Sequence, residues 1–362
     1  MTGDNAKLHR FYLFSMPLLL AILTGCGGSL PTAPPTNQLG GSPSAFQSTA
    51  RFKYPYGIAV DTTGNLYVAD AGNNEIRLIT PAGKVTTIEG PPAGIDTPTS
   101  VDVDSANDLF VGNSNEILEI APDRDVTTLA GSDNPGSVNG LDASARFNDP
   151  TDTAFDSSGD LYVADYGNNE IRKITPAGQV STFAGSGGTG SADGAGSSAS
   201  FHGPYAIAID SSDNLYVTDY YNNEIRKITP TGVVSTFAGS TTKGSANGVG
   251  NSASFYLPTG IAIDRYGNLY VADRGNNEIR SITSAGVVTT LAGSTTKGSA
   301  DGTGASASFW SPFGIAVEGS GTVYVADTFN NEIRQITSDG VVTTVAGATT
   351  PGNHDGTALP RN

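Results

Sequence analysis

The chain of 362 residues contains only one cysteine, two methionines, one tryptophan and three histidines. A single cysteine excludes a disulfide within the chain, so packing alone must stabilise the folded part. The sequence has no GxSxG motif that could carry a nucleophilic serine. Beyond the first 25 residues only His202 and His354 remain, which is too few for a three-histidine zinc site.

Basic residues are also scarce: 19 Lys and Arg face 35 Asp and Glu, which gives a net charge of −16. Nucleic-acid binding depends on a basic surface that releases counterions, and no basic cluster occurs here. The charge therefore excludes nucleic acid as a partner and disfavours an anionic membrane face. By contrast, 46 glycines and 20 prolines indicate many tight turns between short elements, which is typical of an all-β protein.

The N-terminus differs from the rest of the chain. Lys7 and Arg10 precede the apolar run FYLFSMPLLLAIL at 11–23, which is shorter than the ~20 residues of a membrane-spanning helix. We interpret 1–25 as a signal peptide. The segment 26–47, rich in Gly, Pro and Ser, is interpreted as a flexible tether.

The signal ends in LTGC, which resembles the bacterial lipobox, and Cys26 is then the lipidated residue. The resemblance implies export and lipid anchoring to the bacterial envelope. Gly27 follows the cysteine, a pattern that in such lipoproteins implies the outer membrane. A cleaved signal peptide followed by an incidental cysteine is the alternative. Under either interpretation we expect the folded domain to span 48–362.

Six repeats follow, and the last four are spaced by 54 residues. Each contains four short apolar runs, such as GIAV, NLYVA, EIRLI and VTTI in the first, joined by turn sequences such as DTTG and TPAG. Four strands with three tight connections form an antiparallel meander, and six such sheets are expected to pack radially as a six-bladed β-propeller. The six units are aligned on their first proline: Pro55, Pro98, Pro150, Pro204, Pro258 and Pro312.

The turn between the second and third runs, ADYGNNEIR at 164–172, recurs in five units. Asp and Asn suit a tight bend, and the arginine can reach back across the hairpin to the aspartate. Residues that build the fold recur in every repeat, whereas a functional site usually occurs at only one place. We therefore interpret these residues as a structural turn clamp. The pairs are Asp70 and Arg77, Asp165 and Arg172, Asp219 and Arg226, Asp273 and Arg280, and Asp327 and Arg334.

The segment GIAIDRYGNLYVADRGNNEIRSI at 260–282 resembles an NHL repeat. The similarity covers about 50–350 and, through the spacers between units, resembles bacterial and teneurin-type NHL arrays. One departure is the glutamate of NNEIR, where NHL repeats often have arginine.

Inserts of 18 residues separate most units, and the two termini resemble the two halves of one insert. This predicts a closed ring with its seam in a loop, no open sheet edge, and a monomer. Units one and two are joined by only PPAGIDT at 91–97.

Two acids break the repeat near the expected channel. Asp102 replaces an alanine of the innermost strand, and Asp152 replaces a glycine or alanine. They are the candidates for a channel ligand or a calcium or other divalent ion, although decay of the repeat without selection explains the same facts and is the favoured explanation. No cofactor is otherwise indicated. The acid of the GSADG loops is a single carboxylate, whereas calcium needs six to eight oxygens, so we interpret it as a turn residue.

Aromatic and basic residues that differ from one unit to the next occupy the loops between the expected strands. Exposed aromatics often mark contact surfaces, although they also fill gaps between blades. The candidate binding surface consists of Tyr166, Tyr220, Tyr221, Arg274, Phe329 and Trp310.

Two functions remain open from the sequence. The first is a lipid-anchored, non-enzymatic scaffold that binds a protein, peptide or glycan at the cell envelope. The second is a hydrolase or lyase with a channel metal, as in lactonases and streptogramin lyases that share the propeller architecture. The absence of a catalytic constellation in the sequence favours the first.

Overall fold

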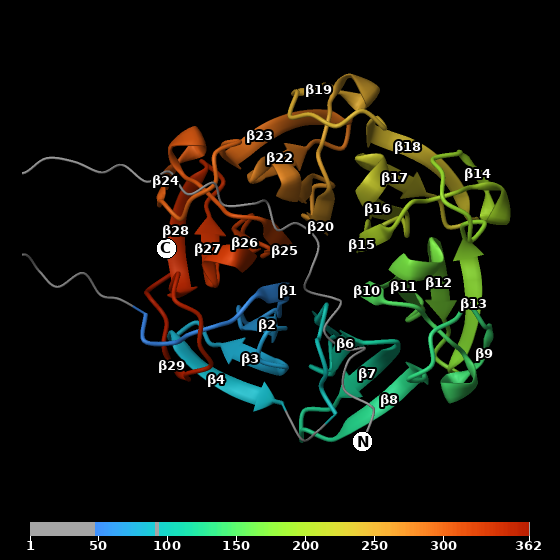
Figure 1. Ribbon diagram of the computed structural model, residues 1–362, viewed down its shortest axis with the longest axis horizontal. Helices are drawn as coiled ribbons and strands as arrows, with labels where there is room; N and C mark the ends of the chain where they lie inside the picture. The colour runs from blue at the N-terminus through green and yellow to red at the C-terminus, as the bar shows by residue number, and fades with distance from the viewer. Residues whose placement is uncertain (1–47, 91–93, 362) are drawn as a thin grey trace, which may run out of the picture. The chain divides into compact units, whose positions relative to one another are not determined.

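The computed structural model describes residues 48–90 and 94–361, and Cys26 with the expected signal peptide and tether lies outside them. The described residues form six antiparallel sheets arranged around a central axis (Figure 1). This is the six-bladed, all-β propeller that the repeats predict. Among the described residues, no helix has the length and apolar character needed to span a membrane.

Each blade is an antiparallel meander whose first strand is innermost. Blades 1, 2 and 3 contain β1 (Pro55–Val60), β2 (Leu66–Asp70), β3 (Glu75–Ile79) and β4 (Lys84–Glu89); β5 (Asp102–Val103), β6 (Leu109–Asn113), β7 (Glu116–Ile120) and β8 (Val126–Gly131); and β10 (Pro150–Phe155), β11 (Leu161–Asp165), β12 (Glu170–Ile174) and β13 (Gln179–Ala184). Blades 4, 5 and 6 contain β15 (Pro204–Ile209), β16 (Leu215–Asp219), β17 (Glu224–Ile228) and β18 (Val233–Gly239); β20 (Pro258–Ile263), β21 (Leu269–Asp273), β22 (Glu278–Ile282) and β23 (Val287–Gly293); and β25 (Pro312–Val317), β26 (Val323–Asp327), β27 (Glu332–Ile336) and β28 (Val341–Gly347).

The core lies between neighbouring blades. The second strand of each blade is almost entirely buried, and Val68 and Val163, for example, are fully inaccessible. Because successive side chains of a strand point to opposite faces, each sheet packs against both neighbours. We call the end of the ring that carries the turns between second and third strands the upper face, and the opposite end the lower face.

Five blades have a fifth strand that the sequence did not predict. In each of these blades, two residues of the insert pair with the start of the outermost strand. A 3₁₀ turn follows four of these short strands. The added strands are β9 (Gly140–Leu141), β14 (Gly194–Ala195), β19 (Gly248–Val249), β24 (Gly302–Thr303) and β29 (Gly356–Thr357).

The seam of the ring joins the two termini. β29, near the C-terminus, pairs with β4 of the first blade, with Gly356 opposite Val85. The amide of Thr49 donates to Thr357 O at 3.0 Å, and that of Arg51 donates to His354 O at 3.0 Å. The C-terminal segment therefore takes the place of the insert that blade 1 otherwise lacks, as the sequence predicts.

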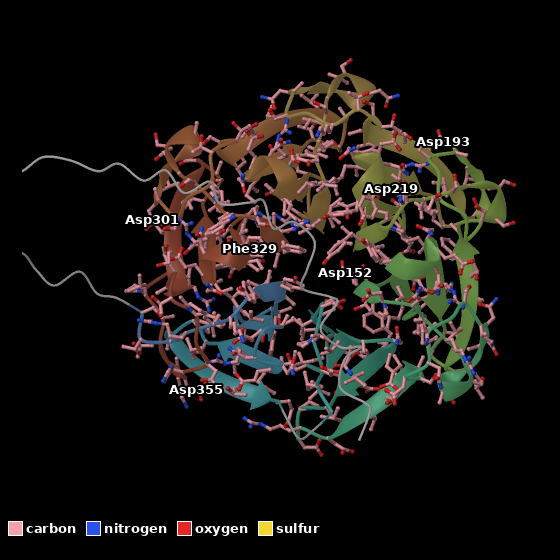
Figure 2. The ribbon with its side chains drawn as sticks, in the orientation of Figure 1. Asp152, Asp193, Asp219, Asp301, Phe329 and Asp355 are labelled. Atoms are coloured by element: carbon pink, nitrogen blue, oxygen red, sulfur yellow. The ribbon has the colours of Figure 1, made fainter. Side chains whose placement is uncertain are left out.

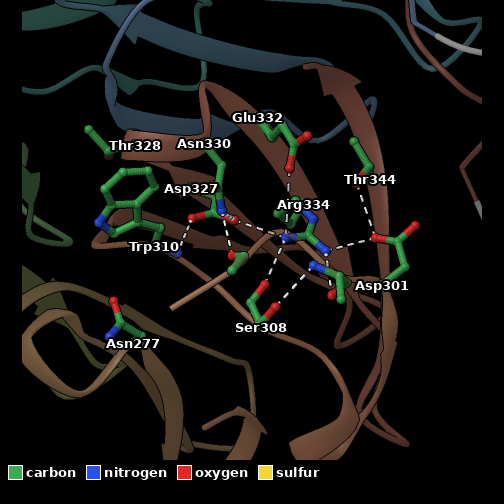
Figure 3. A network of polar contacts seen from close by, with 12 residues as sticks. Asn277, Asp301, Ser308, Trp310, Asp327, Thr328, Asn330, Glu332, Arg334 and Thr344 are labelled. Atoms are coloured by element: carbon green, nitrogen blue, oxygen red, sulfur yellow. Dashed lines mark hydrogen bonds and ion pairs between the residues drawn. The ribbon is translucent and has the colours of Figure 1, made fainter. Parts of the chain in front are cut away.

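The repeated aspartate and arginine are buried ion pairs with no exposed side-chain surface. In blade 6, Arg334 donates to Asp327 at 2.9 Å, to Ser308 O at 3.1 Å and to Asp301 at 2.7 Å (Figure 3). The second oxygen of Asp327 accepts from the amide of Trp310 at 2.8 Å. The pair thus binds the hairpin to the insert that precedes it.

The acid of the GSADG loops is therefore more than a turn residue, which corrects the sequence interpretation. Asp193 and Asp301 of these loops, and Asp355 of the C-terminal segment, lie toward the outside of the ring (Figure 2), where each accepts from the buried arginine of its blade. Asn139 and Asn247 do the same at 2.6 and 2.7 Å. A neutral amide can replace the insert aspartate as the acceptor because the hairpin aspartate already balances the charge of the arginine.

A ring of asparagines links each blade to the next. The side-chain oxygen of Asn331 accepts from the amide of Tyr54 at 2.9 Å, across the seam. That amide belongs to the residue before the repeat proline, which is left-handed in every blade, with φ of 50° for Tyr54 and 49° for Thr97. The equivalent bonds come from Asn74, Asn115, Asn169, Asn223 and Asn277.

Blade 2 departs from this plan in a coordinated way. The part of the chain that the structure describes adds no fifth strand to this blade, and Leu118 and Asn113 stand where the other blades have the clamp. Ile95 replaces the buried phenylalanine that elsewhere lies 5.1–5.4 Å from the arginine, as Phe52 does. Without an insert an arginine would be buried with few partners, so an apolar pair replaces it. No strand of residues 48–90 and 94–361 pairs with the outer edge of β8, which corrects the expectation of no open edge.

Replacing Arg226 by Leu should lower the free energy of unfolding by about 3–5 kcal/mol, because buried Asp219 loses its counterion. Urea denaturation of the full chain measures this loss. Arg265→Leu is the control, since Arg265 is exposed, and it should change stability by less than ~0.5 kcal/mol. Equal losses in both variants would contradict a structural role for the clamp.

Candidate functional site

The channel is narrow because the innermost strands approach one another closely. A Cβ on Gly314 would lie 2.2 Å from Tyr56 O, and one on Gly260 would lie 2.4 Å from Phe313 O. Only glycine fits at such distances. The cavity that remains measures about 40 Å³. Since one water needs roughly 10–15 Å³ of such space, the cavity holds a few waters and no substrate-sized molecule.

Threonines bind neighbouring innermost strands together. The hydroxyl of Thr151 donates to Tyr205 O at 2.6 Å, and that of Thr99 donates to Pro150 O at 2.9 Å. Thr259 makes the equivalent bond to Phe313 O at 3.1 Å. These hydroxyls are occupied by structural bonds, so the channel wall offers few free polar groups.

Asp152 lies near the centre of the ring (Figure 2) and lines the cavity. One of its oxygens accepts from the amide of Ile207, in the next blade, at 2.9 Å. Burial raises the pKa of Asp152 to about 8, and the charge of Asp102 adds to the rise. Asp152 keeps some accessible surface toward the channel, yet the many protein atoms around it make ionisation costly.

Asp102 accepts from the amide of Val103 at 2.8 Å. Burial raises its pKa to about 6, and the charge of Asp104 contributes. Of the two acids named from the sequence, Asp102 is thus near enough for its charge to contribute to the raised pKa of Asp152.

A divalent ion would need more ligands than this pair supplies. Calcium takes six to eight oxygens, usually from several acids, and one oxygen of each carboxylate is already hydrogen-bonded. Within residues 48–90 and 94–361, no three His, Cys, Asp or Glu side chains group as metal ligands would. The two acids alone therefore do not fit a calcium site.

Aromatic side chains surround the upper mouth of the channel. Tyr56 stacks on Phe313 with ring centroids 4.5 Å apart, and Tyr205 lies 5.9 Å from Phe313. Arg274 lies 4.6 Å above the ring of Phe313 and also donates a hydrogen bond to Tyr220. Stacked rings with a guanidinium over them narrow this end of the channel.

Tyr56, Tyr205 and Phe313 were not among the predicted site residues. Each follows a repeat proline, where the other three units have threonine. This difference between the two sets of three units is visible in the sequence. It would have identified the aromatic residues at the mouth of the channel.

The predicted binding-surface residues divide between buried and exposed. Tyr220 is almost buried, at 8% exposure, and Arg274 is engaged with the channel aromatics. Tyr221, Trp310 and Phe329 are 44, 39 and 37% exposed.

The exposed residues form two aromatic groups on the upper face. Tyr166 donates to the hydroxyl of Tyr221 at 3.1 Å, and His202 packs against Tyr221 with ring centroids 4.6 Å apart and the rings tilted by 37°. At the other group, the rings of Trp310 and Phe329 are 5.7 Å apart. We call these side chains the upper aromatic surface.

Comparison with known sequences identifies the repeat. The family model described as NHL repeat matches residues 52–77, 147–174 and 255–280, so the chain contains NHL repeats. Each match begins at a buried insert phenylalanine and includes the clamp arginine. The signature of the repeat therefore includes the clamp.

Two curated relatives carry similar segments. Human NHL repeat-containing protein 2 is 27% identical over 285 residues, which cover 68% of this chain and 39% of that protein. Mouse teneurin-3 is 29% identical over 275 residues, which cover 66% of this chain and 10% of that protein. The chain thus spans between a tenth and two fifths of the length of these relatives.

Three solved structures show the same fold. A Bacteroides thetaiotaomicron protein of unknown function is 22% identical, with a TM-score of 0.65 over 82% of this chain and 71% of that one. An auxiliary nutrient binding protein from the same species is 16% identical, with a TM-score of 0.62 over 81% and 70%. Virginiamycin B lyase from Staphylococcus aureus is 19% identical, with a TM-score of 0.53 over 83% and 87%. At these identities the likeness concerns the fold alone.

The raised pKa of Asp152 predicts a pH-dependent stability. The unfolded carboxyl ionises near pH 4, whereas the folded one keeps its proton to about pH 8, so stability falls as pH rises through this window. Asp152→Asn keeps the acceptor for Ile207 and removes the titration. Urea denaturation at pH 6 and 8.5 measures the free energy of unfolding. Its decrease between these two pH values should be smaller in the variant than in the wild type by on the order of 2 kcal/mol.

Asp123→Asn serves as the control, because Asp123 is exposed. It should reproduce the wild-type loss. If Asp152→Asn also reproduces it, the carboxyl is ionised in the folded protein across this range, and the account of a costly buried charge is wrong.

Proposed function

We propose that this protein is a lipid-anchored scaffold of the bacterial cell envelope that binds a protein, peptide or glycan and catalyses no reaction. The observation that carries the proposal is the upper aromatic surface. Tyr221, Trp310 and Phe329 are large, exposed and located at one end of a rigid ring. Rigid aromatic side chains supply contact area at a low entropic cost, and they are enriched in binding hot spots.

The closed channel supports binding at the face of the ring in preference to its centre. A cavity of about 40 Å³ beneath stacked Tyr56 and Phe313 leaves the upper face as the accessible surface. In the S. aureus lyase, alanine in place of one histidine gives a catalytically inactive protein. Here His202 packs on Tyr221 and His354 lies in the exposed seam insert, and neither lines the channel cavity.

The envelope location rests on the sequence. Cys26 in LTGC would carry the lipid, with Gly27 directing the protein to the outer membrane, and 26–47 would tether the ring. We expect a monomer that contacts the membrane only through its lipid.

A photo-crosslinking residue in place of Phe329, in full-length protein expressed in a bacterium, should yield one dominant adduct with an envelope component. The same probe in place of Tyr266 is the control, because Tyr266 is 69% exposed but lies in a lower-face turn. Trp310→Ala should reduce the adduct at position 329 by roughly tenfold, the effect of losing about 1.4 kcal/mol of binding energy.

Adducts of equal yield at both positions, or none at position 329, would contradict binding at the upper face. Cys26→Ser tests the anchor in the same cells. The unlipidated chain should leave the membrane fraction, and its retention there would contradict lipid anchoring.

A channel-metal hydrolase or lyase is the second candidate, and the contribution of the Asp102 charge to the raised pKa of Asp152 favours it. Elemental analysis of full-length protein purified without chelators separates the two candidates. The scaffold predicts less than about 0.1 calcium or zinc per chain. One tightly held ion per chain, lost in Asp102→Ala, would establish the metal site and replace the scaffold by the enzyme.

A further inference from the structure

The junction between blades 1 and 2 lacks most of an insert. Four residues, 91–94, separate Gly90 from Ile95, whereas fifteen, 186–200, separate the equivalent Gly185 and Phe201. The missing part is the one that forms the fifth strand and the 3₁₀ turn elsewhere. Ile95, which follows the shortened connection, remains buried.

The junction between blades 4 and 5 shows what an insert normally does. Gly248 pairs with Val288 at the start of the outermost strand, and the amide of Gly250 donates to Gly286 O at 2.9 Å. Gly250 thus lies near both Gly286 and Phe237 of the preceding blade. As a result, Val288 is only 1% exposed.

At the junction of blades 1 and 2 these positions are open. Ile88 stands where Phe237 would be and Arg124 where Gly286 would be, and both line a cavity of about 320 Å³. Leu78, Leu109 and Ile120 add an apolar floor. We call this cavity the vacant slot. Its volume is in the range that accommodates a peptide segment, on the order of 300 Å³ or more.

The edge beside the vacant slot is also free to pair. Val126 is partly exposed, whereas its five equivalents are at most 1% exposed. Arg124 O occupies the place of the glycine carbonyl that accepts an insert amide in the other five blades, and no donor from the described residues reaches it. Unpaired strand edges and carbonyls are natural templates for an added strand.

Charge indicates the chemistry of the occupant. Asp123 and Asp125 flank Arg124 and are exposed, and Arg124 is engaged with Ile88 O at 3.2 Å. Elsewhere on blade 2, neighbouring acids add to the effect of burial in raising the pKa values of Asp108 and Glu119. A basic segment would relieve this repulsion, and an acidic one would add to it.

We propose that blade 2 binds an extended peptide segment of a partner protein as its fifth strand. The segment has small residues opposite Val126, as the inserts do, and at least one Lys or Arg near Asp123 and Asp125. The chain's own inserts are held in place by the clamps, so they are not free to fill the slot. The site is separate from the upper aromatic surface, and its test does not depend on the function proposed above.

The probe is the insert sequence GSANGVGNS, residues 244–252, as a labelled peptide extended by two lysines. With full-length protein, fluorescence anisotropy should show saturable binding, and hydrogen exchange at Val126 should slow when the peptide is bound. The same peptide with two glutamates should bind at least roughly tenfold more weakly at low salt.

Ile88→Phe introduces the ring that fills the equivalent junction and should weaken binding roughly tenfold or more. Leu291→Phe makes the same change at the junction of blades 5 and 6, which is already filled, and should leave binding unchanged. Replacing 91–94 by the sequence of 186–200 should abolish binding. All three variants must first show the wild-type melting temperature.

Absence of binding at millimolar peptide, or binding that Ile88→Phe and the grafted insert leave intact, overturns the proposal. Equal affinity of the lysine and glutamate peptides overturns the assignment of a basic partner. A dimer in light scattering that the grafted insert dissociates would instead identify a second copy as the occupant, and this also overturns the proposal.

Discussion

The structure depends on one constraint: a guanidinium without exposure to solvent must have all its strong partners supplied by protein. Arg226 meets this at its two terminal nitrogens with Asp219 from its own hairpin and with Ser200 O, Ala192 O and Asp193 from the insert, while its Nε has no hydrogen bond to the described residues and lies 3.9 Å from the carboxylate of Glu224. Neither the hairpin nor the insert alone supplies all the partners of the arginine. Each of the five blades that contain the clamp therefore depends on the insert that precedes it. In blade 1 that segment is the C-terminus, and the same constraint closes the ring.

The clamp acts more through specificity than through net stabilisation. Burying an ion pair costs desolvation energy that its attraction repays only when hydrogen bonds are complete, and apolar replacements are often neutral. Blade 2 contains such a replacement, with Leu118 and Ile95 in the place of arginine and phenylalanine. It folds without an insert, whereas the charged version requires one. The arginine therefore selects the insert and its register, and its loss in blade 2 leaves a slot and a free edge.

Much of the fold follows from the sequence because its signals are local and repeated. The alternation in NLYVA, the Asp–Gly turns and the spacing of the prolines predict strands, hairpins and the number of blades. The fifth strands could not be predicted, because two-residue strands such as Gly248–Val249 have no periodicity and form only through pairing with a distant edge. The role of Asp193 was missed for the same reason, since its partner Arg226 is 33 residues away.

The site was predictable only in part. Departures from the repeat identified Asp102 and Asp152, and the structure places Asp152 in the wall of the channel cavity, but spacing carries no information on cavity volume. Tyr220 and Tyr221 are adjacent in sequence, yet one is nearly buried and the other 44% exposed, because packing around the channel mouth decides which ring faces solvent.

Hydrogen exchange of individual amides in the outermost strands tests the central claim most directly, namely that inserts held by clamps cap five blades and leave the second open. The amide of Val126, at the start of β8, should exchange at least roughly tenfold faster than those of Val180, Val234, Val288 and Val342. Protection of Val126 equal to that of its equivalents in the unliganded protein would show that blade 2 is capped, and would contradict both the vacant slot and the dependence of capping on the clamp.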